Sequence, residues 1–167
     1  FATQEDVFKV IEEVVPYTFE KFTNWKVDKG PFVRIPYKEA MEKYGIDKPD
    51  LRNPLIIQDV TECFKDSDFN AFKGKTVKVI VVPDGNNQGR KFFDKMGEFA
   101  TSNDVGAKGL AWTKIDENGE VAGGIAKFIT PEIKEALQTK YGAANNSAMF
   151  FIADEFEKAQ KIAGLVR

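Results

Sequence analysis

The sequence predicts an α+β fold, a two-layer sandwich in which a mainly antiparallel sheet carries helices on one face. Three observations lead to this prediction. Residues 77–82 have the clearest strand pattern, a run rich in β-branched residues that Pro83-Asp84-Gly85 closes. Asn118-Gly119, between two apolar stretches, is a strong hairpin signal. From residue 77 onward the expected order of elements is β-α-β-β-α-β-α, which favours helices packed on an antiparallel sheet.

The other elements of this sheet follow from periodicity and from turn residues. Phe92, Phe93, Met96 and Phe99 recur at helical spacing. Thr130-Pro131 is a typical helix start, with Thr as the N-cap and Pro in the first turn. The predicted elements are helices at 59–64, 88–102, 130–141 and 154–164, strands at 77–82, 107–115, 125–128 and 148–152, and an edge strand at 69–72.

A helical and extended flanking segment is expected before the sheet. Thr3 and Asp6 have the spacing of a capping box, and apolar residues recur at helical spacing as far as residue 22. Pro16 interrupts that pattern and predicts a kink or a break, because proline has no backbone N–H. A second helix is expected at 37–44, ended by Gly45.

A proline-containing polar stretch at residues 46–54 is the best candidate for a boundary between domains. We therefore expect a flanking segment at 1–58 and a separate domain at 59–167. Phe1 stands where an initiator Met is usual, and the chain stops directly after a helical pattern at Arg167. From these two ends we expect a piece of a longer polypeptide.

The composition excludes several classes of function. The chain has 167 residues, of which 43% are hydrophobic, so it can bury a core of one domain and a smaller appendage. It has no His, which excludes Ser-His-Asp and Cys-His catalysis and any His-bearing zinc site within this chain. Its single Cys forms no internal disulfide and suits a reducing cytoplasm. No signal peptide or bilayer-spanning run is expected.

Charge gives a weak and local indication of nucleic-acid contact. The 24 basic and 26 acidic residues nearly cancel, unlike the balance of a strong nucleic-acid binder, although a local RNA contact stays open. Lys73, Lys75, Arg90 and Lys91 are the candidates for such a contact, and with Lys78 and Lys95 they form one basic patch if the strand and helix surfaces align. Solvated faces are the common explanation for such residues.

Other chemistry-bearing residues have ordinary structural explanations as well. Trp112 can stack on a base if the sheet surface is exposed, although a core position is more common. The loop 85–91 before a helix can hold an anion with its backbone N–H groups, or is a plain solvated loop. Cys63 is interpreted as a small core residue. The loop carboxylates lack the spacing of a calcium loop, and they are Asp47, Asp50, Asp66, Asp68 and Asp84.

Several stretches together resemble one family. Residues 34–52, with Asp47-Lys48-Pro49-Asp50-Leu51-Arg52, are similar to a segment of bacterial-type aspartyl-tRNA synthetases, which are class II enzymes. Gly-Ala-Lys-Gly-Leu-Ala-Trp at 106–112 and Ile-Ala-Lys-Phe at 125–128 resemble the GAD insertion of those enzymes. Phe150-Phe151-Ile152-Ala153-Asp154 resembles the end of that insertion. Ile46 replaces the usual Ser, and residues 83–88 lack the usual Pro-Gly-Gly.

The resemblance implies a role and a limit. Such synthetases attach aspartate to tRNA with ATP and Mg²⁺, act in the cytoplasm as homodimers, and hold ATP and aspartate through motifs that lie outside this stretch. It implies that this chain has no catalytic residue, metal site or cofactor of its own. Its expected partners are the rest of the synthetase and the tRNA acceptor arm, which the insertion supports or orients.

Two other hypotheses stay open from the sequence. The first is a free-standing module of the same fold that binds RNA or protein. The second is a small acid/base enzyme that works through loop carboxylates, which requires a pocket with two close and buried carboxyl groups. The size of the native polypeptide separates the first of these from a synthetase fragment.

Overall fold

The computed structural model describes all residues 1–167, and the chain divides into two compact units, Phe1–Pro36 and Tyr37–Arg167. The predicted boundary between residues 58 and 59 falls inside the second unit. The division into units does not test whether an inserted domain begins at residue 59, so that boundary stays a prediction. The second unit contains the sheet and every candidate site residue named above, so it carries most of the functional argument.

The first unit is built on one helix, α1 (Gln4–Phe22). Its start is the predicted capping box, in which the Thr3 side chain accepts from the Asp6 N–H and the Asp6 carboxylate accepts from the Thr3 N–H. Of the kink or break expected at Pro16, the break does not occur, since the helix continues through Pro16 to Phe22. The chain then returns along the helix, where the Arg34 guanidinium lies 4.4 Å from the centre of the Phe8 ring and bonds to Glu5.

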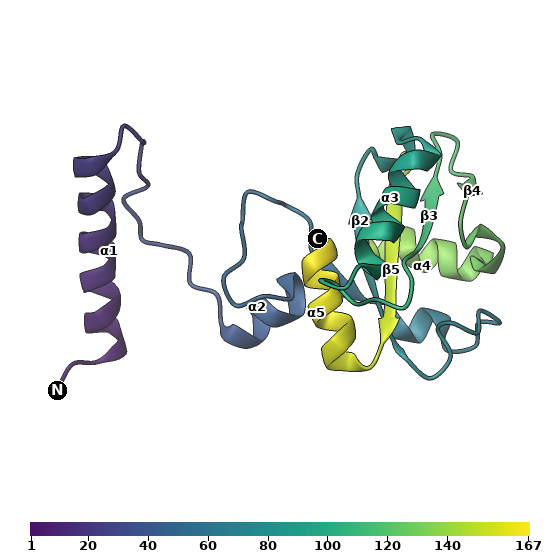
Figure 1. Ribbon diagram of the computed structural model, residues 1–167, viewed down its shortest axis with the longest axis horizontal. Helices are drawn as coiled ribbons and strands as arrows, with labels where there is room; N and C mark the ends of the chain where they lie inside the picture. The colour runs from purple at the N-terminus through teal and green to yellow at the C-terminus, as the bar shows by residue number, and fades with distance from the viewer. The chain divides into compact units, whose positions relative to one another are not determined.

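A five-stranded antiparallel sheet forms the centre of the second unit (Figure 1). Its order is β1-β2-β5-β3-β4, so the last strand in the chain lies in the middle of the sheet. β2 and β5 pair over their full length, from Thr76 opposite Asp154 to Val82 opposite Ala148. The strands are β1 (Ile57–Asp59), β2 (Thr76–Val82), β3 (Ala111–Ile115), β4 (Val121–Ala122) and β5 (Ala148–Asp154). The predicted α+β class and antiparallel sheet are confirmed.

The placement of the helices differs from the prediction, because they cover both faces of the sheet. α3 (Arg90–Thr101) packs on Phe150, and α5 (Phe156–Val166) packs beside it on Ile80 and Ile152. α4 (Pro131–Tyr141) covers the opposite face together with the 3₁₀ helix η1 (Thr61–Phe64). The reason is that β2 and β5 are apolar at both alternating sets of positions, so each of their faces needs a cover.

Two predicted strands are absent. Residues 125–128 form a short 3₁₀ helix, η3 (Ala126–Phe128), because Gly123 and Gly124 take positive φ and end β4 at Ala122. The hairpin partner of β3 is therefore β4, which is joined to it by the predicted Asn118-Gly119 turn. Residues 69–72 form turns that pack their phenylalanines inward, and no edge strand is present there.

The segment before the sheet is held against the end of the chain. α2 (Tyr37–Tyr44) packs on α5, and the Gln160 side chain donates hydrogen bonds to the carbonyls of Met41 and Glu42. The Arg167 guanidinium donates to the carbonyls of Asn53 and Leu55 and lies 4.7 Å from the centre of the Tyr44 ring. Residues 37–55 thus fold as part of the second unit. None of the helices is both long and apolar enough to cross a membrane.

Candidate nucleic-acid interface

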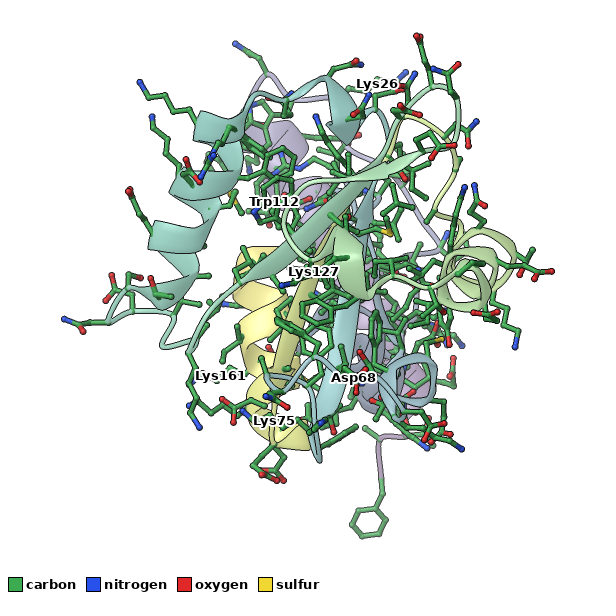
Figure 2. All side chains as sticks on the ribbon, turned by 90° about the vertical axis from the view of Figure 1, so that its right-hand side faces the viewer. Lys26, Asp68, Lys75, Trp112, Lys127 and Lys161 are labelled. Carbon is green, nitrogen blue, oxygen red and sulfur yellow. The ribbon has the colours of Figure 1, made fainter.

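A cavity of about 350 Å³ opens on the α4 side of the sheet, beside the start of β3, and we call it the β3 pocket. Three stretches that are distant in the sequence form it, namely 69–75, 108–112 and 124–125. β5 closes it from behind with Phe151 and Ala153. In Figure 2, Lys75 marks the lower end of the sheet and Trp112 lies well above it. The pocket therefore exists only in the folded chain, where these separate stretches meet.

The floor of the β3 pocket is aromatic. Phe72 and Phe151 are almost fully buried, and Phe69 packs edge-on against Phe72 at 4.7 Å between ring centres. Phe64 packs edge-on against both buried rings from below. Ile125 completes this surface from the segment that follows β4. An apolar floor of this kind favours a flat or branched apolar group in the pocket.

The rim of the β3 pocket is basic. Lys75 approaches from the turn before β2, and Lys108 from the segment before β3. Neither ammonium group forms a direct ion pair with a carboxylate. The nearby Asp154 is paired with Lys158 at 3.2 Å, and the charge of Lys108 helps to lower the pKa of Asp154. No Asp or Glu lines the pocket. The rim therefore offers two unpaired positive charges above an apolar floor.

Trp112 is partly buried and packs against the core. Its ring stacks on Phe93 of α3, with 4.1 Å between ring centres and an angle of 17° between the planes. Gly123 packs closely on the ring and Gly124 on the Trp112 carbonyl, so an added methyl group at either glycine would overlap Trp112. These contacts favour the structural interpretation of Trp112 over base stacking on its ring.

The four predicted contact residues do not form one patch. Lys73 and Lys75 lie directly before the first residue of β2, whereas Arg90 and Lys91 open α3, which follows its last residue. A strand of this length separates the pairs by roughly 20 Å at about 3.3 Å per residue. Whether either pair touches RNA stays a prediction.

Lys78, another member of the predicted basic patch, is buried and unavailable to a ligand. Its Nζ lies 3.0 Å from Asp59 Oδ2 and 4.8 Å from the centre of the Phe156 ring. In the loop before α3, Asn86 bonds to Asn146 and accepts from Lys114, whereas residues 87–91 are exposed. Whether this loop holds an anion stays a prediction.

The loop carboxylates and Cys63 do not assemble into a catalytic centre. No three potential metal-ligating side chains come together anywhere in the chain. Cys63 is half-buried, and its Sγ lies 3.9 Å from the Tyr141 hydroxyl. Burial and the neighbouring Cys63 raise the pKa of Tyr141 above its ordinary value. We find no pair of close, buried carboxyl groups of the kind that the acid/base hypothesis requires.

Comparisons with known proteins fit this architecture. The GAD domain family matches residues 69–163, which include the whole β3 pocket. The entire chain aligns at 52% identity with the aspartate–tRNA(Asp/Asn) ligase of Rickettsia felis and at 50% with that of Rickettsia bellii. It aligns at 48% identity with the aspartate–tRNA ligase of Streptomyces coelicolor. In each case it spans 28% of the relative's length.

Proposed function

Because this chain belongs to the GAD domain family, we propose that it is the insertion-domain part of an aspartate–tRNA ligase, where it supports or orients the tRNA acceptor arm. One observation carries the proposal. The whole chain aligns without remainder, at 48–52% identity, to a 28% portion of ligases that bear this name. A free-standing module of the same fold would not need to match the flanking residues 1–58 as well.

The chain itself has no catalytic role in this proposal. The complete ligase joins aspartate to tRNA with ATP and Mg²⁺, acts in the cytoplasm and forms a homodimer. In this proposal the groups that bind aspartate and ATP belong to the remaining 72% of such a ligase. The insertion acts on the tRNA rather than on the activation of aspartate.

The surface of α1 supports a role within a larger protein. Within the unit Phe1–Pro36, the side chains of Val7, Val10 and Val14 are each more than half exposed along one side of the helix. Apolar faces of this kind are usually covered by another surface. We propose that the rest of the ligase covers this one, which assigns residues 1–58 to the catalytic domain and its linker.

A transplant tests the proposal directly. The matching portion of the Rickettsia felis ligase is replaced by this chain, and two reactions are measured, namely aspartate-dependent ATP–pyrophosphate exchange and aspartylation of tRNA. We expect both reactions in the transplant and neither with the isolated chain. Removal of residues 69–163 from the transplant, with the ends rejoined, should retain exchange and raise the KM for tRNA.

Two outcomes contradict the proposal. A folded transplant that exchanges ATP but does not aspartylate tRNA would show that this domain does not perform the tRNA-related function of the relative's own domain. A native polypeptide of only 18.8 kDa in the source cell, detected with an antibody against this chain, would favour the free-standing binding module.

A further inference from the structure

We infer that the β3 pocket binds a single nucleotide unit, with its base against Phe69 and its phosphate between Lys75 and Lys108. This inference rests on the proposed function only for the natural source of the ligand, which is then an unstacked nucleotide of RNA. A free nucleoside monophosphate offers the same chemistry. No comparison assigns a ligand to this pocket, so the inference goes beyond the family relationship.

The size and shape of the pocket suit one nucleotide. Its volume of about 350 Å³ lies at the small end of ligand pockets, which begin near 300 Å³. Phe69 is the partly exposed ring of the floor, whereas Phe72 and Phe151 are almost fully buried beneath it. A base of any identity can pack against Phe69, because every base has a π-face. A folded peptide or a helix would not fit into this space.

The charge of the rim suits a phosphate. Lys75 and Lys108 line the pocket from two different segments, and neither forms a direct ion pair, although the charge of Lys108 also acts on Asp154. Ammonium groups act as mobile point charges for phosphate oxygens, and two of them match a phosphate that carries one or two negative charges.

The backbone around the pocket has unpaired N–H groups that can form hydrogen bonds with the edge of a base. The N–H groups of Lys108, Gly109 and Leu110 have no backbone acceptor, because the pairing of β3 with β5 begins at Ala111. Gly109 has open space where a side chain would stand. The exposed backbone can therefore approach a ligand closely and exchange hydrogen bonds with it.

The same edge is too short for an extended peptide. The Ile125 N–H already bonds to the Trp112 carbonyl at 2.9 Å, and β4 pairs with Lys114 and Ile115 beyond it. Only residues 108–110 remain unpaired, whereas addition of a peptide strand requires a longer row of free backbone groups. A compact ligand is therefore favoured over a peptide.

Calorimetric titration of the chain tests the inference. The probes are AMP, CMP, GMP and UMP, the four nucleosides, inorganic phosphate and a short single-stranded RNA. We expect the monophosphates to bind at least about tenfold more tightly than nucleosides or phosphate alone, since both parts of the ligand contribute. The RNA should compete with the bound monophosphate if the natural source is RNA.

Substitutions inside and outside the β3 pocket test whether the monophosphates bind there. Lys75→Gln and Lys108→Gln should each weaken binding of the monophosphates about tenfold, the effect of one charged hydrogen bond. Ala71→Trp places a large side chain from an exposed turn position into the pocket and should abolish binding. Lys95→Gln and Lys140→Gln remove exposed lysines away from the pocket and should leave binding unchanged.

The outcomes separate this inference from the proposed function. Failure of all four monophosphates to bind the folded chain at millimolar concentration would overturn the inference, as would binding that Ala71→Trp and both lysine variants leave intact. In either case an active transplant would still support the proposed function. Conversely, pocket-dependent binding by the chain together with an inactive transplant would uphold the inference and refute the proposed function.

Discussion

Lys78 Nζ lies 3.0 Å from Asp59 Oδ2, so a buried ammonium on β2 bonds to a half-exposed carboxylate on β1. The Lys78 side chain is only 5% exposed, and its charge also faces the ring of Phe156 at 4.8 Å. A buried charge is tolerated when it has a partner and is costly when the partner is removed. The pair therefore fixes the position of the short strand β1 on the sheet.

We expect Asp59→Asn to destabilise the chain by about 1–2 kcal/mol, because it leaves the Lys78 ammonium buried without its counter-charge. This expected loss of stability is smaller than the loss for a fully buried ion pair, because Asp59 is half exposed. Urea denaturation of the second unit measures it. Asp66→Asn, a change at an exposed loop carboxylate, is the control and should have no effect. Equal stability of the two variants would contradict a structural role for the pair.

The same pair predicts part of the acid sensitivity of the fold. Burial tends to raise the pKa of Asp59, but hydrogen bonds from Thr61 and Lys78 outweigh it and hold the pKa below the ordinary value. A depressed pKa contributes stability that is complete above the unfolded value of about 3.9 and is lost as pH falls through the folded value. Stability measured between pH 6 and about pH 3 should fall less steeply in Asp59→Asn than in the unmodified chain.

The sequence predicts individual elements of this fold better than their layering. The run at 77–82, apolar except for Lys78, identifies β2, but the prediction that all helices lie on one face of the sheet is wrong. The same run contains the reason for the error, since a strand that is apolar at consecutive positions is buried on both sides. Gly123-Gly124 likewise precedes the stretch predicted as a strand at 125–128, and the positive φ of both glycines requires a turn.

The site is less predictable than the fold. Lys75 is a candidate from its charge alone, whereas Lys108 enters only through the family resemblance and Phe69 through a predicted strand. Their proximity depends on the pairing of β3 with β5 and on the turn at 69–75, which no local pattern specifies. Lys78 groups with the basic residues in the sequence because an alternating strand pattern does not reveal that a carboxylate on another strand neutralises a lysine.

Gly124→Ala should disrupt the junction between β3 and η3. Gly124 has φ +42°, and a methyl group there would overlap the Trp112 carbonyl, which already accepts from Ile125. We expect a loss of about 3 kcal/mol or more, or failure to fold. Gly97→Ala is the matched control, because it lies within α3 in open space and should stabilise the chain by about 0.5–1 kcal/mol. Thermal unfolding of both variants measures these two changes in stability.

Hydrogen exchange should separate three levels of protection along the chain. The centre of β2 and β5 should exchange most slowly, because both strands are paired on each side and covered on both faces. α1 should exchange fastest of the long helices, since its apolar side is exposed within its unit. α2 should be intermediate because Gln160 and Arg167 hold its surroundings. Protection of residues 7–44 as strong as that of β5 would contradict this ranking.

The two pairs of basic candidates can be separated in the transplanted ligase, because they lie at opposite ends of β2. Lys73→Gln with Lys75→Gln, and Arg90→Gln with Lys91→Gln, remove two positive charges each. A pair that neutralises tRNA phosphates should, when replaced, reduce the slope of log affinity against log salt by about 1 for each phosphate that is no longer neutralised, and ATP–pyrophosphate exchange should stay unchanged. Because Lys75 also lines the β3 pocket, we expect the first pair to have the larger effect on the KM for tRNA. If neither pair alters the slope, then both belong to solvated faces and the acceptor arm meets another surface of the domain.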